Sequence, residues 1–145
     1  MREILFRGKD SITKSWVYGA LVQQQDDPLK EKAFIISYSN YQFGDFSEAV
    51  MHEVDPETVG QCTGFGDKNG NKIFEGDIVS ICNSKTFFFI VYWNHAVKSF
   101  ILKSTVNGVN GIDCNVLDST QDIEVIGNIY DNPEPINDGD ENDRA

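Results

Sequence analysis

Short aromatic and β-branched segments, separated by turn residues, dominate this chain of 145 residues. The clearest of them lie at residues 16–22, 33–38, 78–82, 86–93 and 123–130. Clusters of Gly, Asn, Asp and Pro stand between them, and together they favour strands over helices because β-branched and aromatic side chains pack well on a pleated surface. The pattern predicts an all-β protein with several packed sheets and little helix.

One of these segments, residues 86–93, is apolar on both faces of the strand that it predicts. One face holds Phe87, Phe89, Val91 and Trp93, and the other holds Phe88, Ile90 and Tyr92. An antiparallel strand with one wetted face alternates apolar and polar residues instead. The segment therefore predicts either a central strand covered on both sides, which we favour, or a strand with one face against a partner.

Turn signals divide the chain into three predicted parts. Asp55-Pro56 is a favourable helix start with too few residues behind it for more than a turn or two, so it marks a junction. We expect an N-terminal β region at 1–59 and a C-terminal β region at 60–130, packed together as one compact unit. The second region contains Asn69-Gly70, a strong hairpin signal, and its closely spaced strands predict a small barrel-like half. Residues 131–145 are predicted to form an acidic flexible tail.

The charge of the chain limits its partners. With 23 acidic and 12 basic residues the formal net charge is −11, and about half of it belongs to the predicted tail. An acidic chain disfavours binding to phosphate backbones, which requires clustered Lys and Arg. There is no apolar stretch of roughly 20 residues to cross a membrane, and the N-terminus does not read as a signal peptide. We therefore expect a cytoplasmic protein with no membrane partner.

The cysteines and histidines predict neither a disulfide framework nor a metal site. Cys62, Cys82 and Cys114 are an odd number with no Cys-x-x-Cys spacing. Cys82 ends an apolar run, which favours a small buried hydrophobic residue. A nucleophilic cysteine would need His52 or His95 as its base, and neither lies beside a cysteine in sequence. No cofactor is predicted.

Several ordered motifs resemble one protein family. They are Arg2-Glu3-Ile4, Phe6-Arg7-Gly8-Lys9, Trp16-Val17-Tyr18-Gly19, Pro56–Gln61, Thr63-Gly64-Phe65, Asp67–Gly70, Lys72–Val79 and Ile123–Tyr130 followed by Asn132-Pro133. Taken together the chain resembles the YopX-like family of phage and prophage proteins. The resemblance is weak over residues 21–54 and 94–120, and Gly66 departs from the family pattern without affecting any chemistry. It implies a multi-sheet β fold, and it carries no established activity or catalytic residue onto this chain.

The best carboxylate pair in the sequence is Glu75 and Asp77. In an extended segment residues i and i+2 point to one side, where two carboxylates support acid–base or metal chemistry. The plainer interpretation, which we favour, is a turn before residues 78–82, with Asp77 accepting hydrogen bonds from the backbone.

Aromatic residues supply the other weak binding candidates, Trp16, Tyr18 and Trp93. Trp16 and Tyr18 stand near a modest basic patch of Arg2, Arg7, Lys9 and Lys14. Such a patch contacts nucleic acid by pairing with phosphates and stacking on bases, although a solvated face is the commoner reason for these residues.

Together with the family resemblance, which implies a bacterial host cell, these patterns favour a non-catalytic protein–protein interaction module that binds a host or phage protein. The alternatives are a nucleic-acid-associated module and an acidic DNA mimic that occupies a host DNA-binding protein. An enzyme is the least favoured class, because no motif predicts a reaction. Homo-oligomerisation through the doubly apolar strand or a sheet edge stays open.

Overall fold

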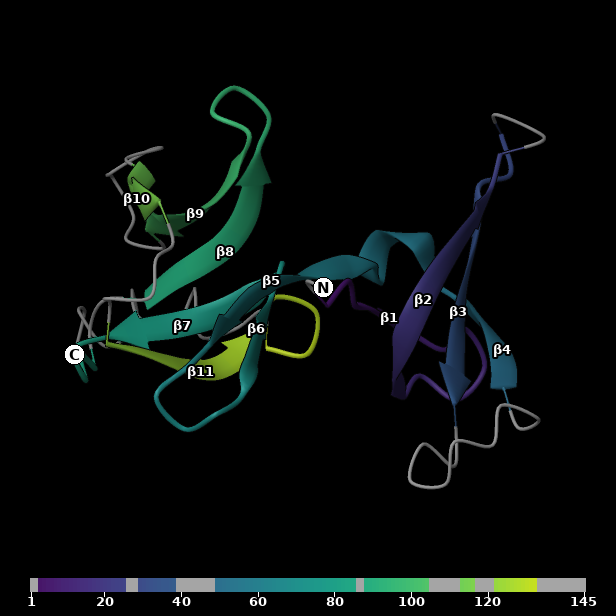
Figure 1. Ribbon diagram of the computed structural model, residues 1–145, viewed down its shortest axis with the longest axis horizontal. Coiled ribbons are helices and arrows are strands. Elements are labelled where there is room, and N and C mark those ends of the chain that lie inside the picture. The colour runs from purple at the N-terminus through teal and green to yellow at the C-terminus, as the bar shows by residue number, and fades with distance from the viewer. Residues whose placement is uncertain are drawn as a thin grey trace, which may run out of the picture. The chain divides into compact units, whose positions relative to one another are not determined.

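The computed structural model describes residues 3–25, 29–38, 49–85, 88–104, 113–116 and 122–132. Their regular structure consists of strands, apart from one 3-10 turn, so the all-β prediction is confirmed. The chain divides into two compact units, residues 1–62 and 63–145 (Figure 1). The predicted boundary lies three residues earlier, and the packing of the two regions as one body stays a prediction. Of the predicted tail, residues 133–145 lie outside the described part.

The first unit is an antiparallel sheet with the strand order β4-β3-β2-β1-β5. Its strands are β1 (Phe6–Lys9), β2 (Trp16–Gln24), β3 (Lys32–Tyr38), β4 (Ala49–Val54) and the beginning of β5 (Gly60–Gly66). An isolated bridge between Asp10 and Val54 ties the chain after β1 to the end of β4. This bridge brings residues 10 and 52 into one neighbourhood.

One face of this sheet forms the core of the first unit. Ala33, Ile35 and Val54 are buried there, and partly buried side chains pack on them: Phe6, Val17, Leu21 and Val59. Gly8 lies against Val54, where an added Cβ would come within 2.9 Å of Val54 Cγ2. A glycine at position 8 therefore lets β1 approach β4 closely enough for the bridge to form.

The junction that Asp55-Pro56 predicted is the 3-10 turn η3 (Pro56–Thr58). The Asp55 side chain accepts a hydrogen bond from Glu57 N at 3.1 Å, as expected of a residue that caps a helical turn. Thr58 Oγ1 donates to Asp55 O at 2.7 Å and accepts from Lys9 N at 2.9 Å. These bonds fix the end of β1 to the turn, so the polar groups of the junction are satisfied.

The second unit contains a five-stranded antiparallel sheet with the order β10-β9-β8-β7-β11. Its strands are β7 (Asp77–Ile81), β8 (Phe88–Asn94), β9 (Ser99–Ser104), β10 (Asp113–Val116) and β11 (Ile123–Asn128), and β5 pairs with β6 (Lys72–Phe74). The prediction of a barrel-like C-terminal half is wrong for the described residues, because β10 and β11 are opposite edges and do not pair to close the sheet.

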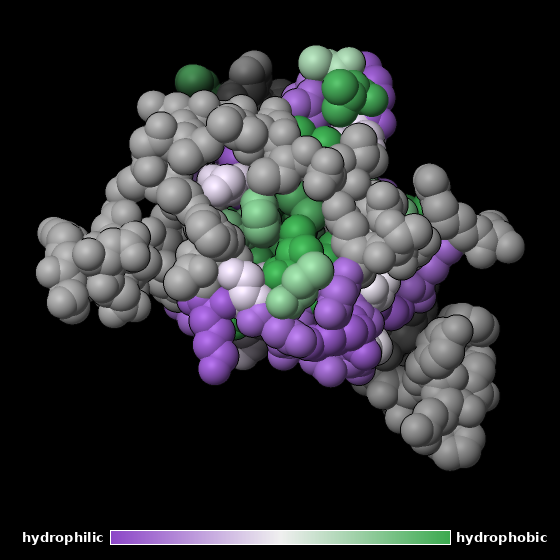
Figure 2. Space-filling model, turned by 90° about the vertical axis from the view of Figure 1, so that its left-hand side faces the viewer, coloured by the Kyte–Doolittle hydropathy of each residue, from purple (hydrophilic) through white to green (hydrophobic). Residues whose placement is uncertain are grey.

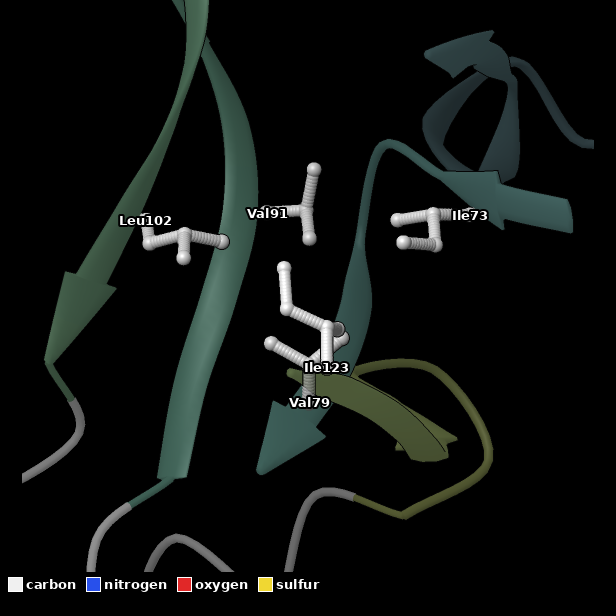
Figure 3. Packing of buried hydrophobic residues seen from close by; sticks show 5 residues of the cluster. All are labelled: Ile73, Val79, Val91, Leu102 and Ile123. Carbon is white, nitrogen blue, oxygen red and sulfur yellow. The ribbon is translucent and has the colours of Figure 1, made fainter. Parts of the chain in front are cut away.

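β8 is the central strand of this sheet, as the favoured interpretation of its apolar pattern expected. Val91 is its one buried residue among those described and the others are partly exposed, so coverage of both faces stays a prediction. Four buried residues on one face of this sheet, Val79, Val91, Leu102 and Ile123, form the core together with Ile73 of β6 (Figure 3). On the other face Ile78 lies opposite Ile90, and Ile78 is buried. Figure 2 views the left-hand side of Figure 1, and apolar residues gather at its centre with hydrophilic residues below them.

The prediction that Cys82 is buried is wrong, because β7 ends at Ile81 and the next two residues turn the chain. Cys82 and Asn83 have φ values of 55° and 57°, in the left-handed region, and Cys82 is exposed. Its backbone N–H donates to Asp122 O at 2.9 Å, so the turn is fixed through the backbone and not through the thiol.

Candidate functional site

The face of the first sheet that points away from its core carries two groups of side chains. The first is a cationic–aromatic corner made of Arg7, Lys9, Trp16 and Tyr18, which face one another as the cross-strand pairs Arg7–Tyr18 and Lys9–Trp16. Arg7 Cζ lies 4.6 Å from the centroid of the Trp16 ring, and Lys9 Nζ lies 5.5 Å from it. These are cation–π distances, which stabilise the corner.

The corner brings together two of the predicted binding residues, Trp16 and Tyr18, with two of the four predicted cations. Arg2 lies outside the described residues, and Lys14 sits in the exposed turn after β1 with φ of 63°. Arg7 is buried, so its guanidinium is largely withdrawn from solvent. Because cations already occupy the Trp16 ring, the corner is a poor platform for stacking a nucleic-acid base.

The second group on this side, which we call the apolar face, comprises Ala20, Val22, Phe34, Ile36 and Met51. Strand register places them in two rows across β2, β3 and β4: Ala20–Ile36–Met51 in one row, and Val22–Phe34 in the next, followed by Glu53. Met51 is 62% exposed and Val22 is 42% exposed. Along each strand, the residues of the apolar face alternate with residues of the core face, so both sides of this sheet carry apolar side chains.

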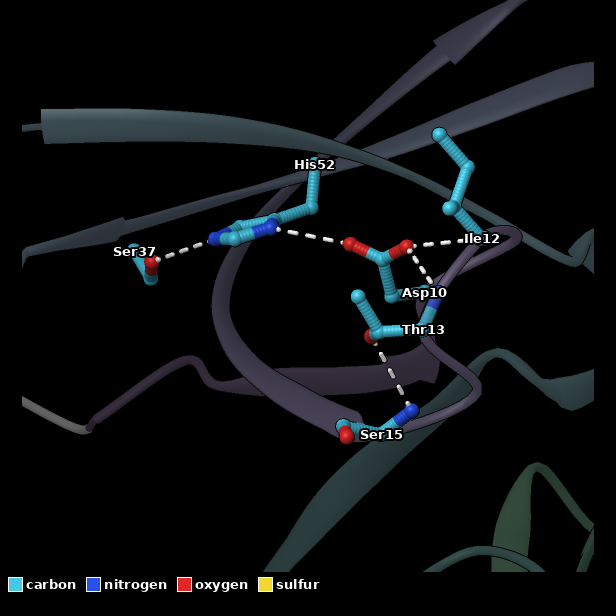
Figure 4. A network of polar contacts seen from close by, with 6 residues as sticks. All are labelled: Asp10, Ile12, Thr13, Ser15, Ser37 and His52. Atoms are coloured by element: carbon cyan, nitrogen blue, oxygen red, sulfur yellow. Dashed lines mark hydrogen bonds and ion pairs between the residues drawn. The ribbon is translucent and has the colours of Figure 1, made fainter.

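On the core face, Asp10, His52 and Ser37 form a hydrogen-bonded array (Figure 4). Ser37 Oγ lies 3.2 Å from His52 Nε2, and His52 Nδ1 lies 3.1 Å from Asp10 Oδ2. His52 pairs with the core residue Ile35 across β3 and β4, and Ser37 follows two residues later on the same face. The array thus lies at the edge of the apolar core, next to Ile35.

The carboxylate of Asp10 is fixed by the turn that follows β1. Its Oδ1 accepts hydrogen bonds from Thr13 N at 3.0 Å and from Ile12 N at 2.8 Å. These two bonds, opposed by desolvation and assisted by His52, hold the pKa of Asp10 below its ordinary value. Asp10 therefore presents an anion to His52 at neutral pH.

Sequence reasoning missed this array. His52 was considered only as a base for a cysteine, and neither Asp10 nor Ser37 was singled out. Asp10 and Ser37 lie 42 and 15 residues from His52, so no local spacing connects them. The three side chains come together because of the β3–β4 register and the bridge at Asp10, and both pair residues that are far apart in the sequence.

The Glu75 and Asp77 pair adopts a turn and not the extended geometry that would place both carboxylates on one side. Residues 75–76 form the turn between β6 and β7. Asp77 is buried, and its Oδ2 accepts from Phe74 N at 2.7 Å. This contact supports the plainer interpretation of Asp77 as a backbone acceptor.

Asp67, which the sequence reasoning did not select, is a buried acceptor that organises the predicted Asn69-Gly70 turn. Its Oδ1 accepts from Asn71 N at 2.8 Å and Asn69 N at 2.9 Å, and its Oδ2 accepts from Val125 N at 3.0 Å. Burial raises its pKa, but the hydrogen bonds from Val125, Asn71 and Asn69 outweigh burial and lower the pKa below the ordinary value. Its role is to join the turn to β11.

The remaining candidate, Trp93, lies on β8 of the second unit and is partly buried. Its ring meets that of Phe100 edge-on, with centroids 5.1 Å apart and an interplanar angle of 72°. Within the described ranges, no group of three or more His, Cys, Asp and Glu residues is placed to hold a metal ion. The same ranges contain no helix that is long and apolar enough to span a membrane.

Comparison with known proteins decides the family. The family model described as YopX protein matches residues 5–137. The chain belongs to the YopX family. The family resemblance predicted from the motifs is thereby confirmed, and the match extends across the stretches in which the motifs were weak.

Among solved structures, the chain is similar to protein EF1440 from Enterococcus faecalis. The two chains are 21% identical, with a TM-score of 0.48, and the similarity covers 94% of this chain and 99% of the other. The search of curated proteins found no match.

Proposed function

We propose that this YopX-family chain is a protein-interaction module that docks another protein on the apolar face of its first unit. The observation that carries the proposal is the exposure of Met51 and Val22 in two ordered rows on β2, β3 and β4. A β-sheet face that is apolar and exposed is costly in water, and contiguous patches of this kind mark interaction surfaces.

The cationic–aromatic corner continues this surface toward β1. Tyr18 is exposed on the same face of β2 as Val22, with Ala20 between them, and Tyr and Arg are enriched at the centres of protein interfaces. Docking on this surface would cover backbone segments that are already ordered by strand pairing. The cost of ordering them on binding is therefore small.

Net charge favours a different protein over a second copy of this chain. At −11 each, two copies repel one another at long range, whereas a neutral or basic partner is not repelled. We therefore propose a neutral or basic partner, of host or phage origin, that presents an apolar patch. The same charge and the occupied Trp16 ring make a nucleic acid the less favoured ligand.

A pair of double variants tests this proposal. Val22→Glu/Met51→Glu places two charges on the apolar face, and Val97→Glu/Ile126→Glu places two charges on residues of matched exposure in the second unit. Val97 is 58% exposed and Ile126 is 44% exposed, against 62% for Met51 and 42% for Val22. Affinity capture at native-like expression, quantified by mass spectrometry, should lose the same partner from the first variant alone.

Two results would overturn the proposal. One is equal recovery of every partner by both double variants, with far-UV circular dichroism unchanged. The other is a dimer of the wild-type chain in analytical ultracentrifugation that the first double variant disrupts, since the face would then bind a second copy.

A further inference from the structure

We infer that Ser37 is a nucleophile activated by His52 and oriented by Asp10, able to accept an acyl group from a carboxylic ester. This activity goes beyond the proposed docking function and differs from the sequence-based expectation of a chain without catalysis. Three side chains from separate segments meet in the order hydroxyl, imidazole and carboxylate, at 3.2 Å and 3.1 Å (Figure 4). This is the order of groups that serine hydrolases use on several unrelated folds.

The ionised carboxylate determines which nitrogen of His52 carries the proton. A carboxylate only accepts hydrogen bonds, so Nδ1 must donate to Asp10 Oδ2. In the neutral ring Nε2 is then an acceptor, and the Ser37 hydroxyl donates to it. This tautomer is the one in which an imidazole takes a proton from a serine.

The array is fixed from both ends. Backbone N–H groups of Ile12 and Thr13 hold the Asp10 carboxylate, so it does not rotate away from the ring. At the other end, strand pairing between β3 and β4 holds Ser37 beside His52. A base held in place by a third group is the arrangement that makes a hydroxyl reactive.

Solvent reaches this end of the core face. The side chains of His52 and Asp10 are 26% and 14% exposed. Val50, which lies opposite Ser37 on β4, is also exposed. The inference therefore requires that a small ester reach Ser37 past these partly exposed side chains.

The reaction that this geometry supports is ester hydrolysis in two steps. Ser37 Oγ forms a bond to the ester carbonyl carbon while its proton passes to His52 Nε2, and the C–O bond to the alcohol breaks as that proton moves to the leaving oxygen. The oxygen of a water molecule then bonds to the acyl carbon while one water proton passes to His52 Nε2. The bond between the acyl carbon and Ser37 Oγ breaks, the carboxylic acid is released, and the proton on His52 returns to Ser37 Oγ to restore the hydroxyl. His52 is the base and acid, and Asp10 is a positioning residue.

A fluorophosphonate probe tests the nucleophile on the intact wild-type chain. Attack by Ser37 forms a Ser–P bond and releases fluoride, so peptide mass spectrometry should find one phosphonate on Ser37. This readout needs no variant and stands even if a substitution unfolds the protein. A phosphonate distributed over several serines, or absent after prolonged exposure, would overturn the inference.

Variants separate activation from accessibility. Ser15→Ala removes an exposed hydroxyl in the same unit and should leave labelling unchanged, whereas His52→Gln should slow it by roughly 100-fold or more, as expected for loss of a general base. Equal labelling rates in wild type and His52→Gln would show that Ser37 is merely exposed.

The role of Asp10 has a spectroscopic signature that a structural role would not change. In wild type, ¹⁵N NMR of His52 should show a protonated Nδ1 in the neutral ring. Asp10→Asn should shift the proton toward Nε2 and slow labelling. If Asp10→Asn keeps the proton on Nδ1 and is labelled at the wild-type rate, Asp10 does not position His52.

Discussion

Replacing Asp67 with Ala should destabilise the second unit by about 3 kcal/mol. The change leaves three backbone N–H groups without their carboxylate acceptor, those of Asn69, Asn71 and Val125. Asn69 and Asn71 are exposed, so water replaces much of what they lose, whereas Val125 is partly buried in β11. The hydrogen bond to Val125 should account for about half of the loss, since bonds to charged groups contribute roughly 1.5–3 kcal/mol.

Urea unfolding of the full chain measures this loss. The chain has two tryptophans, and Trp16→Phe leaves Trp93 as the fluorescent reporter of the second unit. Asp122→Ala, in the same background, is the matched control because Asp122 is an exposed residue directly before β11, and it should change stability by less than about 0.5 kcal/mol. Equal midpoints for Asp67→Ala and Asp122→Ala would refute the assignment of Asp67 as the residue that joins the turn to β11.

Three further predictions concern pH and packing. Because the folded pKa of Asp67 is lowered, its contribution should be complete above the unfolded pKa of about 3.9, and should disappear as the pH falls through the folded value. The stability gap between wild type and Asp67→Asn should therefore narrow in acid, and a gap independent of pH would contradict this. Leu102→Ala removes a fully buried side chain and should cost about 3 kcal/mol, whereas Val97→Ala, at a residue of the same unit that is 58% exposed, should cost almost nothing by the same urea titration. Asp77→Ala should cost about 2 kcal/mol through its lost bond to the Phe74 N–H, and unchanged melting would exclude that structural role.

Local patterns predicted most of the strands and the two best turns. The segment predicted at 16–22 is β2, and the one predicted at 33–38 is β3. Asn69-Gly70 forms the turn between β5 and β6, with φ of 85° at Gly70. These features depend on side-chain alternation and on glycine's access to positive φ, and both are determined by residues that are close together in the sequence.

The sequence patterns did not predict which strands far apart in the chain pair with one another. β10 is only four residues long and carries no run of β-forming residues, so it was missed. The expected barrel did not form in the described residues because closure depends on which edges pair, and spacing along the chain does not determine that. The Asp10–His52–Ser37 array depends on the same information. Cys82 shows the converse, since an apolar run predicted burial one residue past the end of the strand.

Site-specific photo-crosslinking tests the docking face most directly. A benzophenone side chain is placed in turn at Tyr18, Val22 and Met51 on the proposed surface, and at Val97 and Ile126 as controls of similar exposure. The account predicts that one and the same neutral or basic protein is crosslinked from the first three positions in bacterial cells and from neither control. Adducts formed equally from all five positions, or no adduct from the first three, would contradict it.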